Sequence, residues 1–247
     1  MKKQTFFSLL ALILFAANCA EFGKKKKDND DLNSLLLVAA GAAGCPAEQS
    51  VSASPTVGRK FNLVPCSGDA VSALSVLGFN ASNVAFAGGV IGTSDSSTIL
   101  SKGSFNALDG REKTTIEVTY SINSVSGYLD VVMRSNSVNG AAFHITTTKV
   151  QTKAPNTGAT ADFTKTTNFA LTSFTDNTLC LEMHKEGAGL HVLGWKTACA
   201  SVNRAVPDFE EEDFGSNTGA QIGFRLSGAT LKSFTAYDVV GTVTSFQ

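Results

Sequence analysis

Residues 115–122, near the middle of the chain, alternate strictly between polar and apolar side chains. The apolar members are Ile116, Val118, Tyr120 and Ile122. Successive side chains of a β-strand point to opposite faces of its sheet, so a period of two indicates a strand with one buried face. We therefore expect a half-buried strand at this position.

Further segments of the same kind fill the rest of the chain. Extended or alternating stretches occupy residues 128–134, 141–147, 179–184, 190–195, 220–226 and 230–243. The turn residues at 186–189 predict a hairpin, and the stretches between 115 and 147 predict three antiparallel strands. After Leu77 no convincing helical stripe exceeds two turns. Closely spaced strands without interleaved helices predict an all-β, antiparallel β-sandwich or jelly roll.

The composition agrees with short strands and turns and excludes one class of partner. Charged residues make up 17% of the 247 residues, below the roughly 25% of an average soluble protein. The 20 Lys and Arg residues nearly balance the 21 Asp and Glu residues, which gives a formal net charge of −1. Without a basic field the chain is not expected to bind nucleic acid.

The N-terminus is typical of an export signal. Lys2 and Lys3 precede an apolar run at residues 5–17, which is shorter than the roughly 20 residues that span a bilayer. This pattern predicts a signal peptide over residues 1–18. The run ends in Ala-Ala-Asn-Cys19, which resembles the relaxed lipobox of spirochaetal lipoproteins. We expect acylation of Cys19, palmitate included, and hence a membrane anchor; a plain signal peptide with a Cys19 thiol is the alternative.

Residues 19–46 are expected to form a tether. A charged block at residues 24–31 is followed by a Leu- and Ala-rich segment at 35–44, which is too short to cross a membrane as a helix. This layout resembles surface lipoproteins of leptospires. The resemblance covers residues 1 to about 50 and implies an outer-membrane lipoprotein of the cell envelope, exposed at the cell surface. The β-sandwich domain is then expected over residues 47–247.

The cysteine count agrees with export. With Cys19 acylated, four cysteines remain, which are Cys45, Cys66, Cys180 and Cys199. An even number in an oxidising compartment predicts two disulfides, and four cysteines allow three connectivities. The pairs Cys45–Cys66 and Cys180–Cys199 are favoured because each closes a short local loop. A zinc site is disfavoured because neither CxxC spacing nor clustered histidines accompany the cysteines.

The order of the strand motifs resembles a known fold family. The motifs are IEVTYSI at residues 116–122, GYLDVVMRS at 127–135, LCLEMH at 179–184 and TGAQIGFRLSGATLKSFTAYDV at 218–239. Together they resemble the concanavalin A-like lectin and laminin G-like jelly roll over residues 60–245. The resemblance implies binding of carbohydrate or protein.

Alternation also predicts which polar side chains face away from the core. Glu182 and His184 fall opposite the apolar face of their strand, Tyr128 shares a face with Asp130 and Arg134, and Gln221 shares one with Arg225. The candidate binding residues are Tyr128, Arg134, Glu182, His184, His191 and Trp195. If their faces coincide on a concave sheet, they form a groove suited to sugar rings or a protein epitope. In the alternative, Trp195 and Tyr128 are packing residues and the charges form a solvated sheet face.

Metal and catalytic signals are weaker. The acidic loop at residues 208–213 offers Asp208, Glu210 and Glu212 as calcium ligands, but it lacks the spaced pattern of a calcium loop, which favours a solvated loop. We predict no other cofactor. No strand carries the Glu-x-Asp-x-x-Glu pattern of glucanases of this fold, and no hydrolase triad motif is present. We therefore expect no catalytic residues.

These observations predict a lipid-anchored envelope protein whose ectodomain serves surface binding or adhesion. The expected ligand is a host extracellular-matrix protein or a glycan. The alternative function is a carbohydrate-active protein, either a sugar-binding module or a degenerate glucanase-like glycoside hydrolase. A third reading is a purely structural coat lipoprotein.

Overall fold

The computed structural model describes residues 44–53, 56–105, 113–167, 169–187, 189–215 and 219–239. The predicted signal peptide, Cys19 and nearly all of the tether lie outside these residues. No helix among the described residues is long and apolar enough to cross a membrane.

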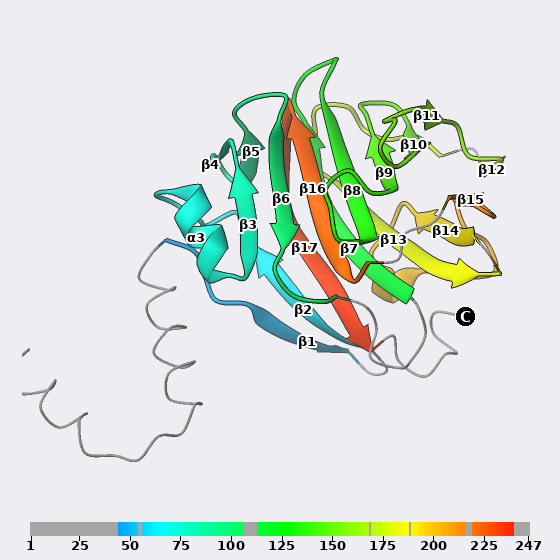
Figure 1. Cartoon of the computed structure of the whole chain (residues 1–247), viewed down its shortest axis with the longest axis horizontal. Coiled ribbons are helices and arrows are strands. Elements are labelled where there is room, and N and C mark those ends of the chain that lie inside the picture. Colours follow the sequence, from blue (N-terminus) through cyan, green and yellow to red (C-terminus); the bar gives the residue numbers. More distant parts are fainter. Residues whose placement is uncertain are drawn as a thin grey trace, which may run out of the picture. The chain divides into compact units, whose positions relative to one another are not determined.

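The described residues form two antiparallel sheets (Figure 1). The ten-stranded sheet has the order β1-β2-β17-β7-β13-β14-β15-β12, with β5 on β17 and β4 on β5. Its strands are β1 (Gln49–Ala53), β2 (Thr56–Asn62), β4 (Val84–Phe86), β5 (Val90–Gly92), β7 (Lys113–Ile122), β12 (Lys165–Thr166), β13 (Asn177–Glu186), β14 (Gly189–Trp195), β15 (Phe209–Glu211) and β17 (Ala229–Val239).

The seven-stranded sheet packs against it and has the order β11-β10-β9-β8-β16-β6-β3. Its strands are β3 (Phe79–Ser82), β6 (Ser97–Ser101), β8 (Tyr128–Ser135), β9 (Ala142–Ile145), β10 (Val150–Lys153), β11 (Thr160–Ala161) and β16 (Gln221–Ser227). The predicted all-β, antiparallel sandwich of jelly-roll type is thereby confirmed.

The core lies between the sheets and is built by the alternation that the sequence displays. The ten-stranded sheet contributes Ile116, Val118, Leu179, Leu181, Met183, Leu190 and Val192. The seven-stranded sheet contributes Leu129, Val131, Met133, Ile222, Phe224 and Leu226. The intervening polar residues therefore face outward on each sheet.

One predicted pairing is wrong. The strands between residues 115 and 147 do not form one three-stranded unit, because β7 belongs to the ten-stranded sheet whereas β8 pairs with β9 and β16 in the other. Both β7 and β8 carry an apolar face, and packing these faces against each other buries both. The chain crosses between the sheets at Gly127, where an added Cβ would lie 2.6 Å from the Gly228 carbonyl oxygen of the β16–β17 crossing.

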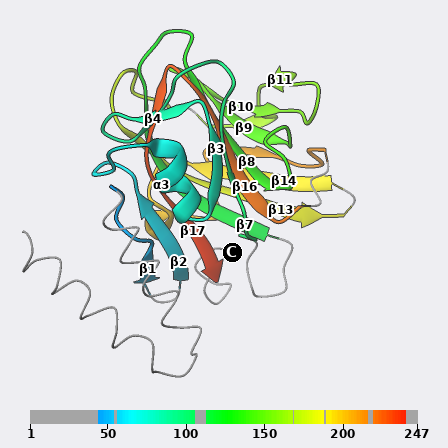
Figure 2. The same ribbon diagram turned by 60° about the vertical axis from the view of Figure 1, so that its left-hand side comes forward.

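Helical structure is short, as expected. Helix α3 (Ala70–Val76) begins after Asp69, whose Oδ1 accepts a hydrogen bond from the Ser72 backbone N–H at 2.8 Å. The helix packs beside β3 and β4 (Figure 2). A single 3₁₀ turn, η2 (Cys199–Ser201), follows β14 among the described residues.

The disulfides join the pairs that loop length favours. Cys45 is bonded to Cys66, and Cys180 to Cys199. The first bond ties residue 45 to the segment after β2, so a soluble version of the domain has to begin before Cys45 rather than at residue 47. The second bond ties β13 to η2.

Candidate functional site

The candidate binding residues lie on two different surfaces. Tyr128 belongs to β8 of the seven-stranded sheet, whereas Glu182, His184 and His191 face outward from β13 and β14 of the ten-stranded sheet. Because the apolar faces of the two sheets meet in the core, their outward residues are on opposite sides of the sandwich. The prediction of one shared groove is therefore wrong.

Three of the candidates are also buried, namely Trp195, Arg134 and Glu182. Trp195 is 3% exposed and packs with Leu193, Tyr237 and the Cys180–Cys199 disulfide, and its Nε1 donates to the Asn203 carbonyl at 2.9 Å. It is a packing residue, not a stacking platform. Arg134 occupies a bulge of β8 with φ of 51°, and it is 3% exposed. The bulge breaks the alternation that predicted a shared face with Tyr128.

A polar cluster occupies the outer face of the seven-stranded sheet. We call it the Asp130 cluster, and its members are Tyr128, Asp130, His144, Lys153 and Arg225. Asp130 is directly opposite His144 on β9 and Arg225 on β16. Its Oδ1 lies 2.5 Å from His144 Nδ1, and its Oδ2 lies 2.9 Å from Lys153 Nζ and 2.9 Å from Arg225 Nε. The sequence placed Tyr128 and Asp130 on one face, and the pairing of strands adds the three basic residues.

The environment of Asp130 keeps it ionised. The carboxylate is fully buried, which alone would raise its pKa, but the hydrogen bond with His144, the charge of Arg225 and the contact with Lys153 outweigh burial and lower the pKa. Lys153 and Arg225 together exceed the single carboxylate of Asp130 by one formal positive charge.

Tyr128 forms one wall of this cluster. Lys153 Nζ lies 5.2 Å from the centroid of the Tyr128 ring, and the His144 ring lies 5.4 Å from it between centroids. Burial, and next the nearby charge of Asp130, raise the pKa of the phenol, which therefore stays protonated at neutral pH. Its hydroxyl donates to the Asp95 carbonyl at 3.3 Å.

Two nitrogen donors of Arg225, Nε and Nη2, have no hydrogen-bond partner among the described residues. Its Nε contact with Asp130 is an ion pair without hydrogen-bond geometry, and its Nη2 makes no hydrogen bond to any side chain or backbone group in the described part of the chain. Its Nη1 lies 3.5 Å from the Asn139 Oδ1. A buried, unfilled guanidinium donor is unusual, because such groups normally find a partner.

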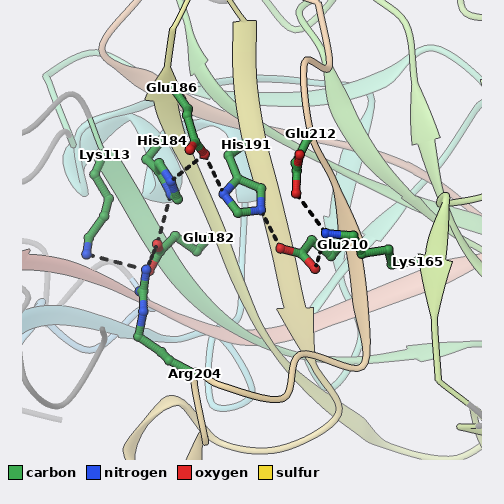
Figure 3. A network of polar contacts seen from close by, with 9 residues as sticks. All are labelled: Lys113, Lys165, Glu182, His184, Glu186, His191, Arg204, Glu210 and Glu212. Atoms are coloured by element: carbon green, nitrogen blue, oxygen red, sulfur yellow. Dashed lines mark hydrogen bonds and ion pairs between the residues drawn. The ribbon is translucent and has the colours of Figure 1, made fainter.

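The second polar surface is at the β13–β14 hairpin and is drawn in Figure 3. We call it the hairpin network, and it contains Lys113, Lys165, Glu182, His184, Glu186, His191, Arg204, Glu210 and Glu212. Within this network, Glu182 is fully buried and accepts hydrogen bonds from Arg204 at 2.5 and 2.8 Å. Burial favours a higher pKa for Glu182, but the hydrogen bonds from His184 and Arg204 and the charge of Lys113 lower it to about 2.

The two histidines of the network are cross-strand partners. His184 is directly opposite His191, and their ring centroids are 4.8 Å apart. His184 Nδ1 lies 3.1 Å from Glu182 Oε1, and His191 Nε2 lies 2.7 Å from Glu210 Oε1. The sequence singled out both histidines and Glu182. It missed Glu186, although Glu186 follows His184 by two residues and so shares its face.

The calcium prediction gains no support from the positions of its residues. Asp208 accepts from the Lys196 backbone N–H at 2.6 Å, and Lys165 Nζ bridges Glu210 at 3.2 Å and Glu212 at 2.7 Å. Part of the predicted acidic loop is in fact strand β15. Calcium takes 6–8 oxygen ligands, whereas the carboxylates here are paired with cations and backbone. Groups of metal-ligating side chains within 4.8 Å do occur nearby, and each includes His191: one with His184 and Glu186, the other with Glu210 and Glu212.

No protein-family model matches the chain. No curated protein matches it either. Solved structures do match. One is the metal-free carbohydrate recognition domain of Emp46p, at 14% identity and a TM-score of 0.46 over 72% of this chain and 95% of that one. The carbohydrate-binding module CBM66 from Bacillus subtilis matches at 18% identity and a TM-score of 0.40, over 66% and 92% of the two chains.

The galectin LEC-6 from Caenorhabditis elegans matches at 9% identity and a TM-score of 0.32, over 54% of this chain and 84% of that one. Likenesses of this size carry no argument about a ligand. The functional conclusion therefore has to come from the chemistry of the two polar surfaces.

Proposed function

We propose that this protein is a lipid-anchored envelope protein whose β-sandwich binds an anionic glycan through the Asp130 cluster. The observation that supports the proposal is the pair of cations Lys153 and Arg225, which share one buried carboxylate while Lys153 lies against the Tyr128 ring. Of the two ligand classes expected from the sequence, a host-matrix protein or a glycan, the compact size of this cluster favours the glycan.

The charges of the cluster select the kind of glycan. Asp130 is shared among three basic side chains, so Lys153 and Arg225 are not fully neutralised. A guanidinium presents a planar fork that matches a carboxylate or sulfate. We infer that an acidic group of the sugar binds where the Arg225 and Lys153 side chains reach the surface, while the sugar ring lies against Tyr128.

The cluster is also held in place before any ligand arrives. The side chains of His144, Lys153 and Arg225 are only 15%, 15% and 16% exposed. Fixing the donors in advance reduces the entropy lost when a ligand binds. Such an arrangement suits binding, and because Asp130 is ionised and enclosed it does not suit general-acid catalysis. We therefore propose a binding protein rather than a glycoside hydrolase.

Four features support a location in the envelope. The signal pattern of residues 1–18 and the lipobox at Cys19 support export and acylation, and the layout of residues 1–50 resembles leptospiral surface lipoproteins. The two disulfides agree with an oxidising compartment. Outer-membrane anchoring and surface exposure remain part of the proposal.

A glycan array tests the ligand class. The purified full-length chain in detergent is compared on uronic acid-containing or sulfated oligosaccharides and on neutral ones. We expect binding that is confined to the acidic set and weakened by salt. Binding confined to neutral sugars, or no binding to any acidic glycan, would contradict the proposal.

A further inference from the structure

The end of the β13–β14 hairpin carries two imidazoles and a carboxylate that converge on one point (Figure 3). Gly187, with φ of 58°, reverses the chain so that His184 and His191 are adjacent. Glu186 Oε2 lies 2.8 Å from His191 Nδ1 and 3.7 Å from His184 Nε2. One ligand atom from each of the three residues is within 4.8 Å of the other two.

We propose that His184, Glu186 and His191 bind one divalent transition-metal ion, with zinc as the best fit. Two imidazole nitrogens and one carboxylate oxygen are a common zinc ligand set, and three protein ligands leave the fourth position to water or an external ligand. The proposal does not depend on the glycan site, which lies on the opposite sheet.

The outer nitrogens of the two histidines are already held by carboxylates. His184 Nδ1 faces Glu182 Oε1 at 3.1 Å, and His191 Nε2 faces Glu210 Oε1 at 2.7 Å. Zinc-bound histidines almost always have such a partner on the nitrogen that does not bind the metal, because it fixes the ring and makes the ligand more basic. Here both imidazoles are oriented so that the remaining nitrogen points to Glu186.

Glu182 is itself fixed, so the arrangement is rigid on this side. Arg204 and Lys113 pair with its carboxylate, and Thr115 Oγ1 donates to it at 3.2 Å. The arginine comes from the segment after η2, 22 residues beyond Glu182 in the sequence. It keeps the carboxylate in place without approaching Glu186.

The neighbouring group, formed by His191, Glu210 and Glu212, fits a metal less well. Lys165 Nζ lies between Glu210 and Glu212, at 3.2 and 2.7 Å, and would have to leave before a cation entered. Within the described part of the chain, the ion-pair partners of Glu186 are the two imidazoles. Calcium is also disfavoured, because it requires oxygen ligands rather than two ring nitrogens.

The spacing suits a small ion after a modest adjustment. Ligand atoms around a tetrahedral zinc with bonds near 2.1 Å are about 3.4 Å apart. The observed contacts of 2.8 and 3.7 Å to Glu186 lie on either side of this value. The Glu186 side chain is 63% exposed, so it can rotate, and the rings of His184 and His191 are 22% and 14% exposed, so an ion can reach them.

Zinc titration of the full-length chain in detergent, after chelator treatment, tests the site. Calorimetry gives affinity and stoichiometry, and Co²⁺ absorption in the visible range reports tetrahedral ligation. We expect one ion per chain. Glu186→Gln and His184→Gln should each weaken zinc binding by more than about 100-fold, and Glu210→Gln, which changes an outer partner, by about 10- to 100-fold.

His144→Gln is the matched control for zinc uptake, because it removes the third histidine of the chain, which is on the other sheet. Its zinc affinity should equal that of the unchanged chain. Thermal melting of each variant shows that it is folded, and Glu186→Gln is the decisive variant because its side chain is exposed.

Three results would overturn the proposal. The first is the absence of saturable zinc binding in the unchanged chain. The second is unchanged affinity in folded Glu186→Gln. The third is a larger loss in Glu212→Gln than in Glu186→Gln, which would assign the ion to the neighbouring carboxylates. None of these results bears on glycan binding.

Discussion

Replacing Trp195 by alanine should unfold the domain more readily without removing a ligand platform. The side chain is 3% exposed and packs against the Cys180–Cys199 disulfide. A buried tryptophan removes roughly 150–250 Å² from water, which corresponds to about 4–6 kcal/mol at about 25 cal/mol/Å² as an upper estimate. Measured Trp→Ala changes in protein cores cost about 3–5 kcal/mol. We therefore expect a loss of about 3–5 kcal/mol in the free energy of unfolding.

The assay is thermal and urea denaturation under non-reducing conditions, with Phe174→Ala as the matched control. Phe174 is also aromatic but is 56% exposed, so its loss should cost less than about 1 kcal/mol. For a domain of about 200 residues, the expected loss in Trp195→Ala lowers Tm by about 6–20 °C. Since Trp195 is the only tryptophan, fluorescence reports on it alone, and the unchanged chain should show blue-shifted emission that glycans do not alter.

Two results would refute this reasoning. One is a loss of stability in Trp195→Ala no larger than in Phe174→Ala. The other is emission typical of a water-exposed indole that shifts when a glycan binds. Either would return Trp195 to the binding surface that alternation alone suggested.

Three further predictions concern the cysteines and Asp130. Cys180→Ser combined with Cys199→Ser should lower the free energy of unfolding by about 3 kcal/mol, because the disulfide closes a loop with a separation of 19 residues. Urea denaturation measures this loss, and a loss near zero would contradict the prediction. Cys19→Ala should abolish palmitate incorporation and detergent-phase partitioning; an unchanged label would refute the anchor.

Because the pKa of Asp130 is lowered in the folded state, the unfolded chain binds more protons below about pH 4. Stability from this carboxylate is therefore present above that pH and is lost as the pH falls through the folded pKa. Asp130→Asn should reduce the loss in the free energy of unfolding as the pH falls through this range. An unchanged pH dependence would contradict the prediction.

Local patterns in the sequence predict much of the fold. Alternation in residues 115–122 and 179–195 correctly gives the inward and outward faces of β7, β13 and β14, because the pleat fixes them residue by residue. Loop length likewise indicates Cys180–Cys199 as a pair, because closing a short loop costs less conformational entropy than closing a long one.

The assignment of strands to sheets could not be predicted in the same way. Whether β8 pairs with β7 or packs opposite it depends on contacts between distant segments, and both choices bury the same apolar face. Because β8 lies in the sheet opposite β13 and β14, the candidate binding residues are divided between two surfaces. Arg204, which neutralises Glu182, comes from a segment without periodicity, and the bulge at Arg134 leaves no mark in the alternation.

The most direct test of whether Arg225 recognises an acidic sugar is the change in affinity when the carboxyl group of the ligand is reduced. The dissociation constant of an acidic oligosaccharide and of its carboxyl-reduced form is measured for the unchanged chain and for Arg225→Lys, which keeps a cation beside Asp130 but removes the guanidinium fork. Arg59→Lys makes the same change on β2 of the other sheet and is the control.

Hydrogen bonds to charged groups contribute about 1.5–3 kcal/mol, so carboxyl reduction should weaken binding to the unchanged chain and to Arg59→Lys by about 10- to 100-fold. In Arg225→Lys the same reduction should change the affinity by a few-fold at most. An equal loss in all three chains would mean that Arg225 does not read the acidic group, and would contradict the proposed function.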